Sequence, residues 1–223
     1  MTRTDRFLDV ADLRVEFHVQ NGVAKVINGL DFHVNRNETL GIVGESGCGK
    51  SMTAMAILGM IPVPPGRISS GRIFFKGEDL LRADKRRMRQ VRGKNITMIF
   101  QEPMTSLNPV YTAGEQIAET LRYHRRMSRN DAFQEAIRML KTVSIPSPDR
   151  VARQFPYELS GGMRQRAIIA MALACSPDLL IADEPTTALD VTVQAQIFEL
   201  LKEIQANRDT AIIFITHDMA AIA

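Results

Sequence analysis

Polar and apolar residues alternate along the first third of the chain. A period of two is typical of strands that bury one face. The alternation is clearest in residues 13–19 and 30–34, and residues 73–75 form a short apolar run. These three segments predict a β-rich region near the start of the chain.

Continuous runs without polar side chains follow, at residues 40–43, 179–182 and 211–215. Such runs are typical of parallel strands that are buried on both faces. Helical patterns separate them, so the later part of the chain predicts alternating strands and helices.

Helices are predicted at residues 52–58 and 167–175, and a capping signal at Ser128 predicts the start of another. The helix after Ser128 and a helix near residue 200 show apolar residues at helical spacing. The positions expected to face the core are Phe133, Ile137, Leu140, Val193, Ile197, Leu200, Leu201 and Ile204.

Residues 44–51 read Gly-Glu-Ser-Gly-Cys-Gly-Lys-Ser and fit the phosphate-loop pattern between a predicted strand and a predicted helix. Glycines let the backbone N–H groups wrap an anion. Lys50 supplies a charge for the β- and γ-phosphates, and the Ser51 hydroxyl is suited to Mg²⁺. The predicted ATP contacts are Gly44, Glu45, Ser46, Gly47, Cys48, Gly49, Lys50, Ser51 and Met52.

A second candidate phosphate site is the stretch Leu-Ser-Gly-Gly-Met-Arg-Gln-Arg at residues 159–166. Ser160, Gly161 and Gly162 would open a helix, and a helix N-terminus offers free N–H groups and a positive dipole end. Many Gly-Gly pairs are only turns. The prediction gains weight from the phosphate loop upstream and an acidic strand downstream.

The acidic strand runs from residue 178 and ends in Asp183, Glu184 and Pro185. Carboxylates at the end of a buried parallel strand are typical of a ligand crevice. Asp183 is a candidate for holding Mg²⁺, and Glu184 for polarising the attacking water as general base. The alternative is a strand that ends in a solvated turn.

Three further motifs complete the pattern: Gln101 in residues 98–103, Asp190 in residues 187–190 and His217 in residues 215–218. With them, the chain resembles the nucleotide-binding subunit of ATP-binding-cassette (ABC) transporters over nearly its whole length. The runs at residues 104–109, 161–166 and 182–196 are similar to the oligopeptide and dipeptide permease branch, whose relatives also move nickel and glutathione.

The resemblance implies roles for these residues. Gln101 would touch Mg²⁺ or the attacking water, His217 the γ-phosphate, and Asp190 the nucleotide site. Ser160, Gly161 and Gly162 would close the ATP site of a second ATPase subunit, identical or paralogous, in a head-to-tail dimer. These residues are expected on a helical insert, away from the phosphate loop of their own chain, so they would act on the site of another subunit.

The resemblance also implies partners and place. Integral membrane permease subunits would carry the solute, most simply di- or oligopeptides, with nickel or glutathione as alternatives. A solute-binding protein would act indirectly, and no nucleic acid is expected. The chain would sit peripherally on the cytoplasmic face of the cell (inner) membrane.

The expected fold class is α/β: a P-loop NTPase parallel-sheet core with an antiparallel β edge and an inserted helical subdomain, as in an ABC ATPase. We expect one domain, with the β edge and phosphate-loop core at 1–102, the helical subdomain at 103–162 and the rest of the core at 163–223. Family members of this branch continue well beyond the position of His217, so a truncated C-terminus is expected. Two residues, Phe17 and His18, are equal candidates for the ring that stacks on the adenine base.

Composition narrows the class of protein further. With 223 residues, of which 45% are hydrophobic, the chain can bury a substantial core. Cys48 and Cys175 are its only cysteines, which suits a reducing compartment and excludes an iron–sulfur cluster within the chain. No apolar run approaches the ~20 residues of a spanning helix, so a soluble protein that reaches membranes through a partner is expected.

Basic residues are concentrated at 85–94, and the net charge is +3. No aromatic residues interleave with these charges, which favours a solvated helix face over a nucleic-acid surface.

Two rival functions remain. An ABC ATPase acting on nucleic acid or ribosomes would carry a long coiled coil or a second cassette, and a non-hydrolysing module would lack Glu184 or His217.

Overall fold

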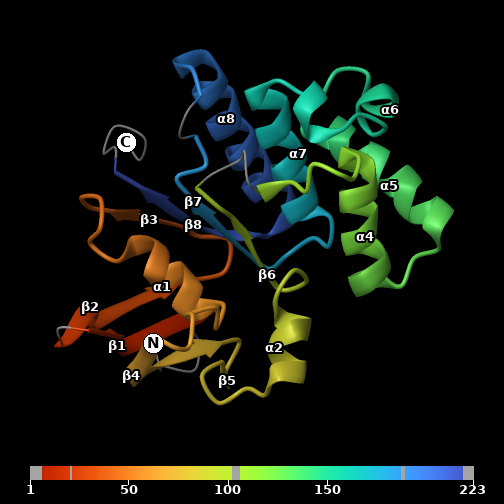
Figure 1. Cartoon of the computed structure of the whole chain (residues 1–223). Helices are drawn as coiled ribbons and strands as arrows, with labels where there is room; N and C mark the ends of the chain where they lie inside the picture. Colours follow the sequence, from red (N-terminus) through yellow and green to blue (C-terminus); the bar gives the residue numbers. More distant parts are fainter. Residues whose placement is uncertain (1–6, 21, 102–105, 187–188, 218–223) are drawn as a thin grey trace. The chain divides into compact units, whose positions relative to one another are not determined.

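The computed structural model describes residues 7–20, 22–101, 106–186 and 189–217. The chain divides into two compact units. The first unit comprises Met1–Arg92 and Ala211–Ala223, and the second comprises Gly93–Thr210. Figure 1 shows the elements of both along the chain.

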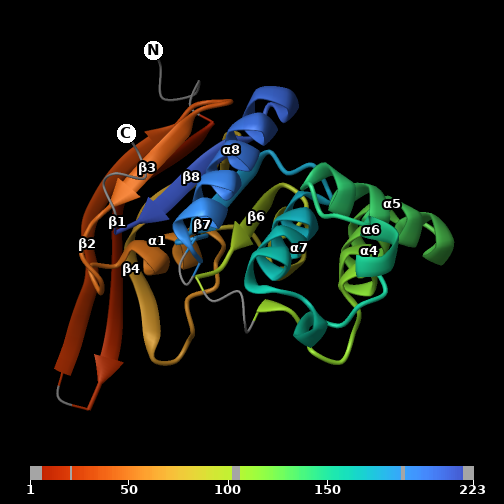
Figure 2. The ribbon, with the colours of Figure 1, turned by 90° about the horizontal axis from the view of Figure 1, so that it is seen from above.

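An antiparallel sheet of four strands dominates the first unit, in the order β2-β1-β4-β5. Its strands are β1 (Leu8–Val19), β2 (Gly22–Val34), β4 (Gly66–Phe75) and β5 (Glu78–Asp79). β1 and β2 form a long hairpin with β4 on the other side of β1 (Figure 2). The predicted β-rich region is confirmed, and its strands are longer than the alternation indicated.

The alternation predicts the buried face of β1 only along part of its length. Leu13 and Val15 are fully buried, Phe17 is half-buried and Val19 is 53% exposed. The reason is that the far end of the hairpin extends beyond the core, so the same period of two continues with nothing to cover it.

Gly71 of β4 lies where the pairing with β1 shifts register, beside a bulge between Ala11 and Arg14. Its φ is +116°, and a Cβ atom there would lie 2.6 Å from the Leu13 Cα and 2.8 Å from the Asp12 carbonyl oxygen. Both neighbours are backbone atoms that cannot rotate away, so the bulge requires glycine at this position.

Replacing Gly71 by alanine should therefore lower the free energy of unfolding by about 2–4 kcal/mol, as expected for backbone strain combined with overpacking. Urea denaturation monitored by circular dichroism measures the loss. Gly77→Ala is the control, because Gly77 has a similar positive φ of +81° but nothing within 4 Å of the Cβ position. An equal loss in both variants would contradict the steric explanation.

The first unit also contains the parallel pair β3 (Thr39–Val43) and β8 (Ala211–Thr216) with helix α1 (Lys50–Ile57). In the pairing of β3 with β8, Val43 lies opposite Thr216. The carboxyl ends of the two strands therefore coincide, and the segments that follow them start at the same edge.

Helix α2 (Lys85–Val91) accounts for most of the basic run. Asp84 caps it by accepting a bond from the Arg87 amide, and the Arg87 guanidinium pairs with Glu78 at 2.7 Å. Met88 and Val91 are buried while Lys85, Arg86 and Arg89 are exposed. The basic side chains therefore lie on the exposed face of a helix, and the preference for a solvated face over a nucleic-acid surface stays a prediction.

The second unit combines the parallel strands β6 (Ile96–Ile99) and β7 (Leu179–Asp183) with helices. The helical elements are α4 (Ala113–Arg125), α5 (Arg129–Thr142), α6 (Pro148–Val151), the 3-10 helix η2 (Pro156–Glu158), α7 (Gly161–Leu173) and α8 (Val191–Arg208). Helix α5 packs against α4, α6 and α7, and α7 packs against β6 (Figure 1). The predicted boundaries at residues 102 and 162 stay a prediction.

Ser128 caps α5, as predicted, by accepting a bond from the Asp131 amide. The predicted core face was wrong in part, because Phe133 and Ile137 are only half-buried. The buried face consists of Ala132, Ala136, Met139 and Leu140. The ring of Phe133 lies outside this face, under the Arg153 guanidinium.

Candidate nucleotide site

The phosphate loop joins β3 to α1 in the first unit, as the sequence predicts. Gly47 and Gly49 have φ values of +84° and +97°. A Cβ atom at Gly49 would lie 2.8 Å from the Val26 carbonyl oxygen, and one at Gly44 would lie 2.8 Å from Cys48 Sγ. The loop thus follows a path that only glycine permits and brings its backbone close to any anion it encloses.

Lys50 is 7% exposed and begins helix α1. Its Nζ donates to the carbonyl oxygens of Gly44 and Glu45, at 2.7 and 2.8 Å. The ammonium group is therefore held inside the curve of the loop. The first turn of α1, which includes Ser51 and Met52, contains no acidic side chain, so nothing opposes the positive end of its dipole.

His217 lies in the same unit, directly after β8 and exposed to solvent. Because Val43 and Thr216 are opposite each other, Gly44 and His217 both leave the sheet at the same edge. The structure thus brings His217 to the side of the pair from which the phosphate loop starts.

Cys48 offers a chemical test of the loop, because its side chain is exposed within it. Burial raises the pKa of the Cys175 thiol above its usual range, which lowers its thiolate fraction and its reactivity near neutral pH. We expect maleimide to modify Cys48 first and abolish ATP binding, and prior Mg-ATP to protect it. Mass spectrometry of the wild type measures the order of labelling, and nucleotide affinity and ATP protection are measured in a Cys175→Ala variant. Full labelling of that variant with unchanged affinity would exclude the loop as the ATP site.

The second unit holds three of the predicted residues: Gln101 after β6, and Asp183 and Glu184 at the end of β7. Ile99 pairs with Ala182, so Gln101 and Glu184 follow their strands side by side. Gln101 Nε2 donates to Glu184 Oε2 at 2.9 Å. Asp183 is 3% exposed at the end of β7, and Glu184 adopts a left-handed φ of +46°. The turn therefore aims two carboxylates differently, one buried and one half-exposed beside an amide.

The predicted magnesium ligands, Ser51, Gln101 and Asp183, are single oxygen donors on separate elements. The described residues contain no cluster of three or more His, Cys, Asp or Glu side chains that could hold a metal by itself. A hydroxyl and a carboxylate are ligands that Mg²⁺ uses when phosphates complete its shell. The chemistry of each donor is therefore of the kind that Mg²⁺ takes beside a nucleotide, and a shared magnesium site stays a prediction.

Ser160 caps helix α7 by accepting a bond from the Met163 amide at 3.3 Å, with Gly161 and Gly162 in the first turn. Asp190 likewise caps α8 through the Val193 amide at 2.9 Å. A Cβ atom at Gly162 would lie 3.1 Å from Val193 Cγ1. The N-terminal ends of α7 and α8 thus meet in the second unit.

Two glutamines next to this junction were not predicted to have roles. Gln165 of α7 is fully buried, and its Nε2 donates to the Pro185 carbonyl oxygen at 2.5 Å. Gln194 of α8 donates to the carbonyl oxygens of Thr186 and Leu189, each at 3.2 Å. The signal in the sequence was their place in the runs at residues 161–166 and 182–196, which carry the family resemblance.

Both candidates for the adenine platform lie on β1 and both remain candidates. His18 is exposed, and its amide bonds to the Pro65 carbonyl oxygen at 3.0 Å. Phe17 is half-buried, with its ring edge 3.1 Å from the position of a Cβ at Gly66.

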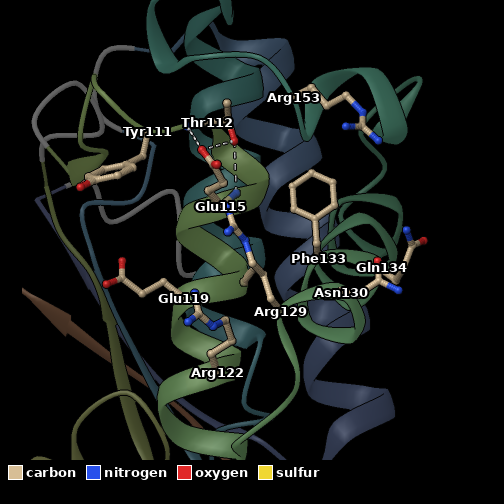
Figure 3. Close-up of a pocket in the computed structure, with 11 residues that line it drawn as sticks. Tyr111, Thr112, Glu115, Glu119, Arg122, Arg129, Asn130, Phe133, Gln134 and Arg153 are labelled. Carbon is tan, nitrogen blue, oxygen red and sulfur yellow. Dashed lines mark hydrogen bonds between the residues drawn. The ribbon is translucent and has the colours of Figure 1, made fainter.

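The helical part of the second unit contains an open hollow of about 800 Å³, away from these motifs in sequence. Thr112 and Glu115 form a capping box on α4 at its rim, and Arg129 and Phe133 of α5 line it (Figure 3). Tyr111, 52% exposed, stands at its edge. Arginines and aromatic side chains occur together here, and both are enriched at protein interfaces. No helix within the described residues is long and apolar enough to cross a membrane.

A strand, a glycine loop around a buried lysine and a helix, with carboxylates after a parallel strand, define a phosphate-loop protein of the α/β class. The family model for ABC transporters matches residues 27–187, and the chain belongs to that family. The fold agrees: a dimeric ATP-binding cassette, MJ0796, bound to ADP and Pi superimposes with a TM-score of 0.85 at 26% identity, covering 96% of this chain and 89% of the other.

Relatives of known role are closer in sequence. The oligopeptide transport ATP-binding protein OppD of Bacillus subtilis is 54% identical over 223 residues, which cover 100% of this chain and 62% of OppD. The glutathione import ATP-binding protein GsiA of Pectobacterium atrosepticum is 52% identical over 223 residues, 98% of this chain and 36% of GsiA. The chain thus spans less than two thirds of the length of these relatives.

Proposed function

We propose that the chain is the ATP-binding and ATP-hydrolysing subunit of an ABC transporter that imports di- or oligopeptides. The observation that carries the proposal is the contact of Gln101 with Glu184 at the end of a buried strand, in a chain whose phosphate loop is complete. A module that only bound ATP would need no carboxylate held beside an amide at this place.

Each residue has a task that its surroundings support. Lys50 and the N–H groups of the glycine loop bind the phosphates of ATP, and Ser51 and Asp183 hold the magnesium ion. Glu184 accepts the proton of the attacking water, Gln101 orients that water or the metal, and His217 contacts the γ-phosphate. The magnesium ion, when bound, neutralises charge on the β- and γ-phosphate oxygens.

A second ATPase subunit completes the site in this proposal. Ser160, Gly161 and Gly162 bind the γ-phosphate held by the partner subunit, in a head-to-tail pair. The Ser160 oxygen accepts the capping bond at 3.3 Å, which leaves the hydroxyl hydrogen to donate outward. Asp190, exposed at the start of α8, lies next to this surface and serves the same junction.

Integral membrane permease subunits are the proposed link to the membrane, at its cytoplasmic face. The hollow between α4 and α5, with exposed Tyr111 at its edge, supports a protein contact there. Peptides are the proposed solute because OppD is an oligopeptide transport protein. Glutathione, itself a small peptide, is the second candidate, because GsiA is a glutathione import protein.

The test uses the complex that co-purifies with the chain from detergent-solubilised membranes, reconstituted with its solute-binding protein. We expect Mg-ATP hydrolysis to rise when oligopeptides are added and to disappear in a Glu184→Gln complex. If only glutathione stimulates hydrolysis, glutathione replaces oligopeptides as the proposed solute. The absence of any ATP hydrolysis would contradict the proposed activity.

A further inference from the structure

The geometry points to Gln165 and Gln194 as positioning residues that hold the general base Glu184 through the backbone that follows it; this inference rests on the proposed ATPase function. We call the two side chains the glutamine clamp. They come from different helices, α7 and α8, and both donate to carbonyl oxygens of the turn after β7.

Gln165 makes the shorter contact of the clamp. Its Nε2 lies 2.5 Å from the carbonyl oxygen of Pro185, the residue directly after Glu184, and both Gln165 and Pro185 are buried. The bonded carbonyl belongs to the peptide unit between Pro185 and Thr186, and the proline ring fixes φ of Pro185. The bond therefore restrains Glu184 from its C-terminal side through one stiff residue, while β7 restrains it from the other side.

Gln194 holds the next part of the same turn. One amide group reaches both Thr186 and Leu189, at 3.2 Å each, and the Leu189 amide itself donates to the Thr186 carbonyl oxygen at 3.2 Å. The clamp thus ties the turn to α8 as well as to α7. This accounts for a glutamine in the run at residues 191–196, to which the proposed function gives no task.

The turn needs such support because Glu184 has a left-handed φ of +46°. That conformation is unfavourable for a residue with a Cβ atom and persists only where its surroundings enforce it. Released from the clamp, the backbone would relax toward negative φ, and the carboxylate would swing away from Gln101. Geometric errors of about 1 Å at a catalytic group reduce turnover by about 100-fold.

The buried amide of Gln165 is poorly explained as a stabilising group. Its Oε1 has no hydrogen-bond partner among the described residues, although the side chain is fully buried. An unpaired buried acceptor disfavours folding. Methionine has nearly the same shape as glutamine. Its introduction would remove the unpaired Oε1 and leave the Pro185 carbonyl oxygen unpaired instead. Stability should change little, whereas a positioning role predicts a large loss of activity.

The experiment compares Gln165→Met with Gln196→Met. Gln196 is the matched control, because it is a glutamine of α8 that bonds to Arg166 and not to the turn. We expect Gln165→Met to lower kcat by about 10- to 100-fold, with ATP affinity unchanged and the thermal midpoint within about 4 °C of wild type. The control should keep wild-type kcat.

A double-mutant cycle asks whether Gln165 acts through Glu184. Glu184→Gln alone should already remove the general base, so adding Gln165→Met should lower kcat further by only about 2-fold. An undiminished second loss, or a loss of stability with normal kcat, would overturn the inference. If Gln165→Met fails to fold, Gln194→Met, at a half-buried position, should give the same kinetics and the same coupling.

Hydrogen exchange provides a readout that does not depend on activity. The Leu189 amide should exchange faster in Gln165→Met and Gln194→Met than in wild type or Gln196→Met, with or without ATP. Unchanged exchange in both clamp variants would refute the clamp itself. If the wild-type complex hydrolyses no ATP, the proposed function fails, but the exchange measurement still decides whether the glutamines hold the turn.

Discussion

Glu184→Gln is expected to reduce the rate of ATP hydrolysis by about 10²–10⁴-fold, the usual effect of losing a general base. The amide has the shape of the carboxylate and can still orient water next to Gln101, but it cannot accept the proton. Nucleotide affinity should persist, because Lys50 and Ser51 are unchanged. Steady-state phosphate release and equilibrium binding of labelled ATP measure the two effects separately.

With hydrolysis blocked, ATP should remain bound and hold two subunits together. Light scattering should then show a dimer that forms with ATP and not with ADP. Glu199→Gln is the matched control, since Glu199 is an exposed carboxylate of α8 that pairs with Lys202 at 3.5 Å. Normal turnover in Glu184→Gln would exclude this residue as the base.

Ser160→Arg is expected to abolish that ATP-dependent dimer in the Glu184→Gln background. The arginine would bring bulk and positive charge to the N-terminus of α7, where the proposed mechanism requires close approach to the partner's phosphate. The phosphate loop lies on different elements, so each subunit should still bind ATP. Light scattering and binding measurements on the same double variant check both statements.

The loss of a helix cap has to be separated from the loss of the interface. Ser160 caps α7, and removing such a cap costs about 1 kcal/mol. Ser128→Arg is the control, because Ser128 caps α5 in the same way through the Asp131 amide. We expect equal losses of stability and a normal dimer in the control. A dimer that survives Ser160→Arg would contradict the role given to Ser160, Gly161 and Gly162.

The sequence determined the class of this protein, because its chemistry is carried by local patterns. The loop around Lys50 needs glycines at fixed spacing between a strand and a helix. This pattern can be recognised in the sequence without knowledge of tertiary contacts. The same holds for the caps Ser128 and Ser160, whose side chains bond to amides three residues ahead. Short-range geometry of this kind is set by the residues themselves.

Only the tertiary structure decided what depends on residues distant in the chain. The periodicity of α5 pointed to Phe133 and Ile137, but packing against α4 and α7 selects the smaller Ala132 and Ala136 for the buried face. The need for glycine at position 71 arises from a bulge in another strand.

The clamp is the clearest case of this limit. Gln165 meets Pro185 across 20 residues of sequence, and Gln101 meets Glu184 across 83. A glutamine such as Gln165, between two arginines of a helix, has no visible partner until the chain folds, because hydrogen bonds between distant segments leave no period in the sequence. The sequence therefore identified the groups that carry out the chemistry, and the tertiary structure showed which groups hold them in place.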